Sequence, residues 1–380
     1  MSKVLERVVF KQVVKYVEGN CLVRPSHHGS RAGHSTSTAI IEMYDSWAES
    51  VEAGEMAGVM MIDLSAAFDL VDHHLLLQKL ELLGFDHHAV MWMWSYLSGR
   101  SQCVYVDGKF SDFEQVPVGV PQGSVLGALL YILFVNDLPE VVHGHPGHAQ
   151  QGSPGEKQAL FNLFCSECGG LCCYVDDSTY SFSSSDPVQL SEKLSEQYVK
   201  IADYMGDNKL VINDDKTHLL VMGGQKFKDV RPLVNINTGT VIVKPVETEK
   251  LLGLNIHQSL KWKEHVISNK KSMIKTLTTR LNALRKLSIN ATFKTRLMVA
   301  NSCFMSIIIY MVSVWGGTED YIVRAVQVMQ NKAARCVTKQ SWFTPTKRLL
   351  LQCNWLSIKQ LIFFHTALQV WRVKASKCPV

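Results

Sequence analysis

The stretch Gly58-Val-Met-Met-Ile-Asp-Leu-Ser-Ala-Ala-Phe-Asp69 decides how this sequence is interpreted. It opens as a short apolar run and ends that run on a carboxylate, Asp63. This pattern is typical of a buried strand that delivers a charged side chain to a site. Residues 171–181 have the pattern of a strand, a tight turn and a second strand, with Asp176 and Asp177 at the turn. If these strands pair, three carboxylates gather at one end of a sheet.

Such a group of carboxylates suits the transfer of nucleotides by two divalent ions held about 4 Å apart. Hard ions such as Mg²⁺ prefer oxygen ligands. Asp63, Asp176 and Asp177 are therefore the candidate catalytic and Mg²⁺-binding residues, and the backbone carbonyl of Leu64 would add one oxygen. Each feature has an ordinary alternative when taken alone, such as a solvated turn or a helix N-cap. Their occurrence together favours the catalytic interpretation.

The remaining pattern predicts an α+β fold whose last third is mainly helical. Apolar spacing indicates helices near residues 2–17, 35–47, 75–83, 89–97 and 188–205. An extended hairpin with an Asp107-Gly108 turn is expected at residues 103–118, and further strands at 210–213 and 217–222. The Pro121-Gln-Gly-Ser124 turn is expected to open one long apolar helix that continues to Leu138.

Composition and the first residues predict an intracellular protein. The chain has 380 residues, 47% of them hydrophobic, and 10 cysteines. Its first residues lack the apolar stretch of a secretory signal, so a reducing compartment, the nucleus or the cytoplasm, is expected. The longest apolar run, residues 303–315, is too short to cross a bilayer, which predicts a buried helix and no membrane partner. The oligomeric state is left open.

Charge is divided unevenly along the chain. The formal net charge is +5, but residues 251–380 hold 20 Lys and Arg against 3 Asp and Glu. The C-terminal part is thus strongly basic and the rest of the chain is acidic overall. This division predicts an anionic partner for the C-terminal part. The alternative is a solvated helical surface that keeps its cations for solubility.

The motifs resemble those of reverse transcriptases from non-LTR retrotransposons of the jockey and CR1 kind. The resemblance covers nearly the whole length. It is carried by His27-His-Gly-Ser-Arg-Ala-Gly-His-Ser-Thr36, the segment from Asp63 to Asp69, Val120-Pro-Gln-Gly-Ser-Val-Leu-Gly127, Asn136-Asp-Leu-Pro139, Tyr174-Val-Asp-Asp177, Leu210-Val-Ile-Asn-Asp-Asp-Lys-Thr217, Lys250-Leu-Leu-Gly-Leu254, and Trp262 with His265.

The resemblance implies a right-hand polymerase fold. Residues 1–55 would form partial fingers, and residues 56–255 a palm built on an antiparallel sheet with helices, with an insertion at about 141–170. Residues 256–380 would form a basic, mainly helical thumb and C-terminal region. The implied activity is RNA-directed DNA polymerisation with two Mg²⁺ ions. The implied partners are an RNA template, a DNA primer and deoxynucleoside triphosphates.

The resemblance also implies individual roles. Phe68 would stack under the incoming sugar and exclude a 2′-hydroxyl, although a plain core phenylalanine is the rival interpretation. Arg31 would contact the triphosphate with its fork of donors. Gln122 and Gly123 would let the backbone approach the nucleotide and template. Lys216 would protonate or neutralise the leaving pyrophosphate, or else be a surface lysine.

Three departures from the family pattern shape the rival hypotheses. Ser30 stands where the family has Phe, and His34 where it has a second basic residue. The family's Arg-Pro-Ile-Ser stretch is not found before the first helix, which suggests an N-terminally truncated element. One rival is a catalytically inactive remnant that binds nucleic acid through residues 261–377. Another is a metal-dependent nuclease that uses the same carboxylates.

A second cluster predicts a zinc site with less support. Cys165, Cys168 and Cys172 have zinc-ligand spacing and follow a histidine-rich loop, from which His148 would be the fourth ligand. The alternative is a variable insertion whose cysteines are partly buried beside the catalytic hairpin. A short motif of this kind carries a high false-positive risk.

Overall fold

The computed structural model describes residues 2–143, 164–165 and 169–376. These residues form two compact units. The first unit comprises Met1–Ser35 and Glu49–Pro245, and the second comprises Thr36–Ala48 and Val246–Val380. The site predicted from the sequence lies wholly in the first unit.

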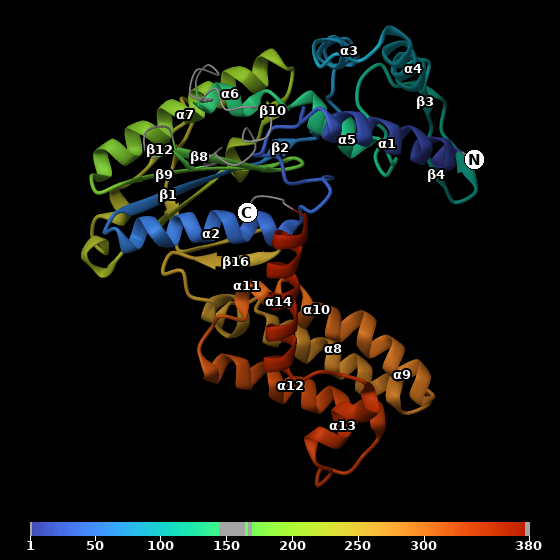
Figure 1. The fold of residues 1–380 in the computed structure, drawn as a ribbon, viewed down its shortest axis with the longest axis vertical. Helices are drawn as coiled ribbons and strands as arrows, with labels where there is room; N and C mark the ends of the chain where they lie inside the picture. Colours follow the sequence, from blue (N-terminus) through green and yellow to red (C-terminus); the bar gives the residue numbers. More distant parts are fainter. Residues whose placement is uncertain (1, 144–163, 166–168, 377–380) are drawn as a thin grey trace. The chain divides into compact units, whose positions relative to one another are not determined.

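An antiparallel sheet forms the centre of the first unit (Figure 1). Its middle strand, β1 (Met56–Ile62), pairs with β9 (Asp177–Ser184) on one side and β11 (His218–Met222) on the other. Beyond β9 lie β8 (Gly169–Tyr174) and the short edge strand β7 (Phe164–Cys165). Every residue of β1 is buried, which explains why its sequence is continuously apolar and does not alternate. The strands expected around Asp63 and the Asp pair are therefore present.

Helix α7 (Pro187–Asp207) covers one face of this sheet (Figure 1). The Asp186 side chain caps its start by accepting from Val188 N at 2.9 Å. A Cβ atom added at Gly58 of β1 would lie 2.8 Å from Leu194 Cδ1 of the helix. Glycine at this point lets the helix pack closely against the sheet.

Further helices complete the first unit. They are α1 (Ser2–Gly19), α3 (His73–Leu82), α4 (His87–Leu97), α5 (Gly127–Phe134) and α6 (Leu138–His143). The prediction of one long apolar helix from the Pro121 turn to Leu138 is wrong in extent, because α5 ends at Phe134. The chain leaves the helix because Asn136 binds Arg24 N and Leu22 O with its side chain, each at 2.9 Å. Asp137 meanwhile accepts from Lys79 Nζ at 2.8 Å.

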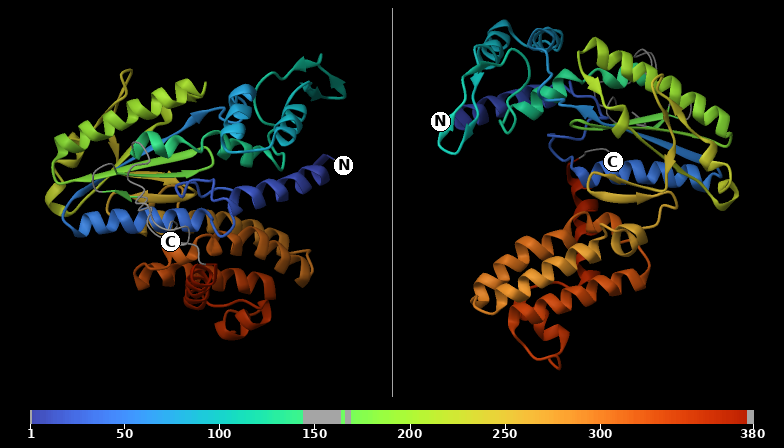
Figure 2. Two further views of the ribbon diagram at one scale, coloured as in Figure 1. Left: turned by 45° about the horizontal axis from the view of Figure 1, so that its top comes forward. Right: turned by 180° about the vertical axis from the view of Figure 1, so that it is seen from behind.

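Short strand pairs and turns lie around the sheet. The pairs are β2 (Leu64–Ser65) with β10 (Val211–Ile212), β3 (Ser101–Gln102) with β6 (Glu114–Gln115), β4 (Tyr105–Val106) with β5 (Lys109–Phe110), and β12 (Ile236–Asn237) with β13 (Ile242–Val243). Three short helical turns, η2 (Asp214–Lys216), η3 (Gln225–Phe227) and η4 (Arg231–Leu233), complete the set. The two-residue strand β14 (Pro245–Val246) belongs to the central sheet, where it is the edge strand next to β11. The β4–β5 hairpin turns at Asp107 and Gly108, both at positive φ, as the Asp-Gly pair predicts. Figure 2 shows this hairpin projecting in teal.

The second unit is mainly helical, as expected for the C-terminal third (Figure 2). It contains the first part of α2 (Thr36–Glu52), the hairpin of β15 (Thr248–Leu251) and β16 (Leu254–His257), and the π-helical turn η5 (Glu264–Ser268). The helices that follow are α8 (Met273–Ser288), α9 (Phe293–Ala300), α12 (Asp320–Thr338), α13 (Thr346–Cys353) and α14 (Ile358–Ser376).

The single buried helix expected at residues 303–315 is not found. The chain there forms η6 (Asn301–Met305), α10 (Ser306–Ile309) and α11 (Val312–Trp315), with Met311 in the left-handed region at φ 50°. The break lets Tyr310 donate its hydroxyl to Leu252 O at 2.7 Å while its carbonyl accepts from Trp315 Nε1 at 3.1 Å. Among the helices that the structure describes, none is both long enough and apolar enough to cross a membrane.

The compact units do not follow the expected boundaries at residues 55 and 255. The chain divides at Pro245, and Thr36–Ala48 groups with the C-terminal residues. The names fingers, palm and thumb therefore stay predictions for the three expected segments.

Candidate active site

The three aspartates gather at one end of the sheet. Ile62 pairs with Ser178 in the β1–β9 register, so Asp63 leaves β1 where Asp177 enters β9. Asp176 occupies the turn between Tyr174 and Asp177, which pair with each other. Neighbouring strands lie about 4.8 Å apart. The two strands and their turn thus bring the three carboxylate-bearing residues to one place.

The electrostatics of this end of the sheet reflect that crowding. The pKa of Asp177 is raised by desolvation and by the charges of Asp176 and Asp63. One cation already stands nearby, since Lys216 Nζ lies 3.4 Å from Asp63 Oδ2. The backbone is tied at the same point, because Asn213 N donates to Asp63 O at 2.9 Å. A bound cation would relieve the repulsion within such a cluster of like charges.

The donor set fits a hard cation in its chemistry, because its side-chain ligands are carboxylate oxygens. It is not assembled into a closed cage. Within residues 2–143, 164–165 and 169–376, no three His, Cys, Asp or Glu side chains stand close enough together to enclose a metal ion. Leu64, predicted to add a carbonyl ligand, is buried in β2 directly after Asp63.

The N-terminal loop is bound to the edge of the β8–β9 hairpin, which carries Asp176 and Asp177. His28 N donates to Cys173 O at 2.9 Å, and Cys173 N donates to Ser26 O at 2.8 Å. The loop approaches so closely that a Cβ atom on Gly29 would lie 2.5 Å from Val175 Cγ2. Val175 itself adopts φ 61°, which is unusual for a β-branched residue. The turn that carries Asp176 is therefore held in a strained conformation by its surroundings.

Arg31 stabilises this loop by hydrogen bonds to the loop backbone. Its Nη1 donates to the carbonyls of Arg24, Pro25 and His27 at 3.1, 3.3 and 2.9 Å. Burial lowers the pKa of His27 to about 4, and the charge of Arg31 adds to that effect. The predicted contact of Arg31 with a triphosphate stays a prediction. The structure adds a role in shaping the loop.

The segment from Asp63 to Asp69 and the Pro121 turn meet at two points. Phe68 O accepts from Val120 N at 2.8 Å, and Gln122 Nε2 donates to both carboxylate oxygens of Asp69 at 3.0 Å. Gly123 adopts φ 72°, and a Cβ atom there would meet open space. The bond to Asp69 thus links the predicted residue Gln122 to the segment that carries Phe68.

Two residues of this arrangement were not singled out from the sequence. Asp69 holds Gln122, and Tyr131 lies under Phe68 with ring centroids 5.1 Å apart. Tyr131 is buried, and burial and the charge of Asp176 raise its pKa. The sequence did offer a signal for Asp69, because it is the second carboxylate of the Asp63–Asp69 segment. Tyr131 lies within a continuous apolar run, which offered no signal.

The predicted zinc site cannot be assembled from the described residues. His148 and Cys168 lie outside them. Cys165 is in β7, where its backbone pairs with Gly169, and Cys172 is buried in β8. Zinc binding therefore stays a prediction.

The second unit contains a basic groove of about 850 Å³. Its wall includes the β15–β16 hairpin and helix α8. Five cationic residues line it together with polar side chains: Lys250, Lys270, Lys271, Lys275 and Arg280. No acidic residue is among the residues that line this groove. Part of the C-terminal excess of cations thus lies on one surface.

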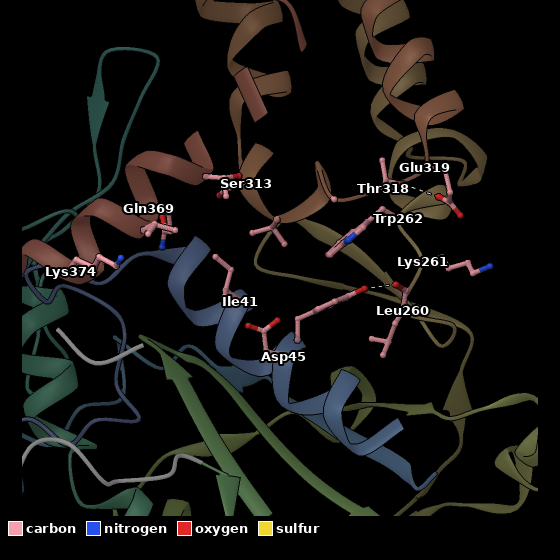
Figure 3. A pocket seen from close by; sticks show the side chains of 15 residues that line it. Ile41, Asp45, Leu260, Lys261, Trp262, Ser313, Thr318, Glu319, Gln369 and Lys374 are labelled. Carbon is pink, nitrogen blue, oxygen red and sulfur yellow. Dashed lines mark hydrogen bonds between the residues drawn. The ribbon is translucent and has the colours of Figure 1, made fainter. Parts of the chain in front are cut away.

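A separate cavity of about 630 Å³ lies elsewhere in the second unit (Figure 3). Ile41 and Asp45 of α2 face Trp262 across it, and Gln369 and Lys374 come from α14. Tyr44 stacks on Trp262 with ring centroids 5.1 Å apart and donates its hydroxyl to Leu260 O. None of the predicted catalytic residues lines this cavity.

Comparison with known proteins identifies the family. A family model described as reverse transcriptase (RNA-dependent DNA polymerase) matches residues 1–289. The chain belongs to the reverse transcriptase family. Its three aspartates, grouped on one antiparallel sheet, lie within the matched part.

Mobile-element proteins of Drosophila are similar over most of the chain. The probable RNA-directed DNA polymerase from transposon BS of Drosophila melanogaster is 25% identical over 381 residues, which cover 97% of this chain and 38% of that protein. The RNA-directed DNA polymerase from mobile element jockey of Drosophila funebris is 25% identical over 91% of this chain and 35% of its own length. The resemblance to jockey-type reverse transcriptases is confirmed. The chain spans little more than a third of these relatives.

A solved structure, apo telomerase from Candida tropicalis, is similar at low level. The match covers 98% of this chain and 61% of that chain, at 10% sequence identity and a TM-score of 0.47.

Proposed function

We propose that this chain carries the polymerase centre of an RNA-directed DNA polymerase of a non-LTR retrotransposon. It would add deoxynucleotides to the 3′-hydroxyl of a DNA primer on an RNA template. The observation that carries the proposal is the meeting of Asp63, Asp176 and Asp177 at one end of the antiparallel sheet in a member of the reverse transcriptase family.

In this proposal Asp63, Asp176 and Asp177 hold two Mg²⁺ ions, with the carbonyl of Leu64 as a further ligand. When bound, the ions supply Lewis acidity to the attacking hydroxyl and to the leaving pyrophosphate. Bound cations would relieve the repulsion from Asp176 and Asp63 that raises the pKa of Asp177. Lys216, now 3.4 Å from Asp63, would release that contact and neutralise the pyrophosphate.

The nucleotide would lie between Phe68 and the Pro121 turn. Phe68 would lie beneath the sugar and exclude a 2′-hydroxyl, and Tyr131 supports its ring from behind. Asp69 fixes the side chain of Gln122, so this turn meets the nucleotide in a prepared conformation. Gly123 has a left-handed backbone conformation, and the space beside its Cα is open. Arg31 would contact the triphosphate, as the resemblance implies.

The basic groove of the second unit would hold the phosphates of template and primer. Its five cations would bind the backbone without reading sequence. In this assignment residues 1–55 are partial fingers, residues 56–255 the palm, and residues 256–380 the thumb and C-terminal region. The groove then belongs to the thumb and to the palm hairpin before it.

Primer extension separates this proposal from its rivals. A labelled DNA primer on an RNA template is incubated with the purified chain and Mg²⁺ or Mn²⁺, with and without deoxynucleotides. Extension that depends on deoxynucleotides and is lost in Asp176→Ala supports the polymerase. Binding without extension would favour the inactive remnant. Degradation of the strands without deoxynucleotides would favour the nuclease.

A further inference from the structure

The end of the chain beyond the family model has a distinct surface chemistry. The reverse transcriptase model stops at residue 289, before α9. Residues 321–380 contain no Asp or Glu but ten Lys and Arg. A surface with cations and no anions attracts polyanions and disfavours acidic partners. The basic groove described above lies outside this region, so its phosphate contacts do not account for these charges.

Several aromatic side chains of this region are exposed to solvent, and two of them are neighbours on one loop. Trp342 and Phe343 lie on the loop between α12 and α13, with 70% and 92% of their surfaces exposed. Large aromatic residues are normally covered in a folded unit, and adjacent exposed rings are available for stacking. The loop has a defined path, because Thr344 N donates to Ser341 O at 3.1 Å and Phe343 N to Ser341 Oγ at 3.3 Å.

One cation contacts a ring of this pair, and further cationic residues precede and follow the loop in sequence. The Arg335 guanidinium lies over the Trp342 ring, 4.7 Å from its centroid, and so fixes one face of the indole. Lys339 is the C-cap residue of α12, and its Nζ donates to Ile289 O at 3.3 Å. Lys347 and Arg348 are exposed in the first turn of α13, directly after the loop. We call these six residues the Trp342 patch: Arg335, Lys339, Trp342, Phe343, Lys347 and Arg348.

We infer that the Trp342 patch binds single-stranded RNA. Exposed aromatic rings beside Lys and Arg are the means by which proteins hold unpaired strands, because bases stack on the rings while cations meet the phosphates. A duplex keeps its bases stacked inside and would leave both rings unused. The choice of RNA rests on the proposed function, in which a single-stranded RNA template is consumed. The patch would then be a template contact made by residues outside the part that the family model matches.

Binding measurements on the full chain test this inference. Fluorescence anisotropy is recorded with an unstructured single-stranded RNA of about 20 nucleotides, longer than typical site sizes, and with duplex RNA and single-stranded DNA of the same sequence. The double variant W342A/F343A should weaken binding to single-stranded RNA by about tenfold or more and change duplex binding by less than about twofold. The variant K347A/R348A should lower the slope of log affinity against log salt by about 1.4.

A matched control is available on the first unit. Lys109 and Phe110 of the β4–β5 hairpin also place a cation beside an exposed ring, and Phe110 is 69% exposed. The double variant K109A/F110A should leave RNA affinity within about twofold of the parent. All affinities are measured in an Asp176→Asn background without deoxynucleotides, so that failure of polymerisation does not affect them. Thermal unfolding of each variant checks that the fold is kept.

Three results would overturn the inference. The first is W342A/F343A binding single-stranded RNA as the parent does. The second is an equal loss on duplex RNA, which would indicate a backbone contact alone. The third is tighter binding of single-stranded DNA than of RNA, which would remove RNA as the partner. None of these results bears on primer extension by the wild-type chain, which tests the proposed function separately.

Discussion

At the scale of single residues, the contact between Gly29 and Val175 controls the turn that carries Asp176. Gly29→Ala places a Cβ atom 2.5 Å from Val175 Cγ2 and 3.0 Å from Val175 N. We expect this overpacking to cost about 1–3 kcal/mol of the free energy of unfolding. The turn should shift as well. Nucleotide incorporation should therefore fall even at temperatures where the variant stays folded. Thermal unfolding and primer extension measure the two effects.

A second substitution serves as the control for this contact. Val175→Gly removes Cγ2 and relieves the left-handed conformation of Val175, worth about 1–2 kcal/mol. The double variant G29A/V175G should therefore recover at least half of the stability lost in Gly29→Ala. Strictly additive effects of the two substitutions on the free energy of unfolding would show that the two residues do not meet.

The aspartates were predictable from the sequence because each follows an apolar strand pattern or lies at a turn. Local pattern was sufficient there, since the register of one antiparallel sheet brings the three together. The bond between Gln122 and Asp69 was not predictable, because it joins side chains 53 positions apart. The engagement of Arg31 with three carbonyls depends on the fold of its loop, which the sequence does not reveal.

At the scale of elements, His265 links the π-helical turn η5 to strand β16. Its Nδ1 accepts from Asn255 N at 3.2 Å, which requires that nitrogen to be unprotonated. Burial lowers the pKa of His265 from 6.5 to about 4. The stability that His265 contributes is thus complete above pH 6.5 and is lost as pH falls toward 4. The whole effect amounts to about 3 kcal/mol.

Substitution of His265 isolates this effect from other histidines. His265→Gln keeps an acceptor in the side chain but cannot take up a proton in this range. The free energy of unfolding of the variant should fall less steeply than that of the parent between pH 6.5 and 4. Denaturant unfolding at a series of pH values gives both curves. Parallel curves would show that His265 is not the titrating group.

Amphipathic helices and alternating or apolar strands were predicted well, since their own periodicity specifies them. Helix α7 and the β8–β9 hairpin are examples. Two apolar runs were misjudged as unbroken helices. Their interruptions, after Phe134 and at Met311, follow from hydrogen bonds that Asn136 and Tyr310 make with distant segments. Continuous hydrophobicity predicts burial and does not locate such breaks.

At the scale of the whole molecule, compact units and sequence segments do not coincide. Thr36–Ala48 groups with the C-terminal unit although it follows the N-terminal loop directly. Local pattern predicts the helix α2 but not the unit to which its residues belong. The division of charge along the chain was predictable from counting alone. Some of the cations of the second unit line a basic groove, which counting could not locate.

The most direct test of the central claim is single-turnover incorporation of one deoxynucleotide on an RNA template. Asp63→Asn and Asp176→Asn should each lower the rate by at least about 1,000-fold, since each loses an anionic ligand of the metal pair. Asp177→Asn should lower it less. Asp203→Asn, an exposed position on α7, should leave the rate unchanged. Rates for Asp63→Asn and Asp176→Asn within about tenfold of the wild-type rate would contradict the assignment of these carboxylates.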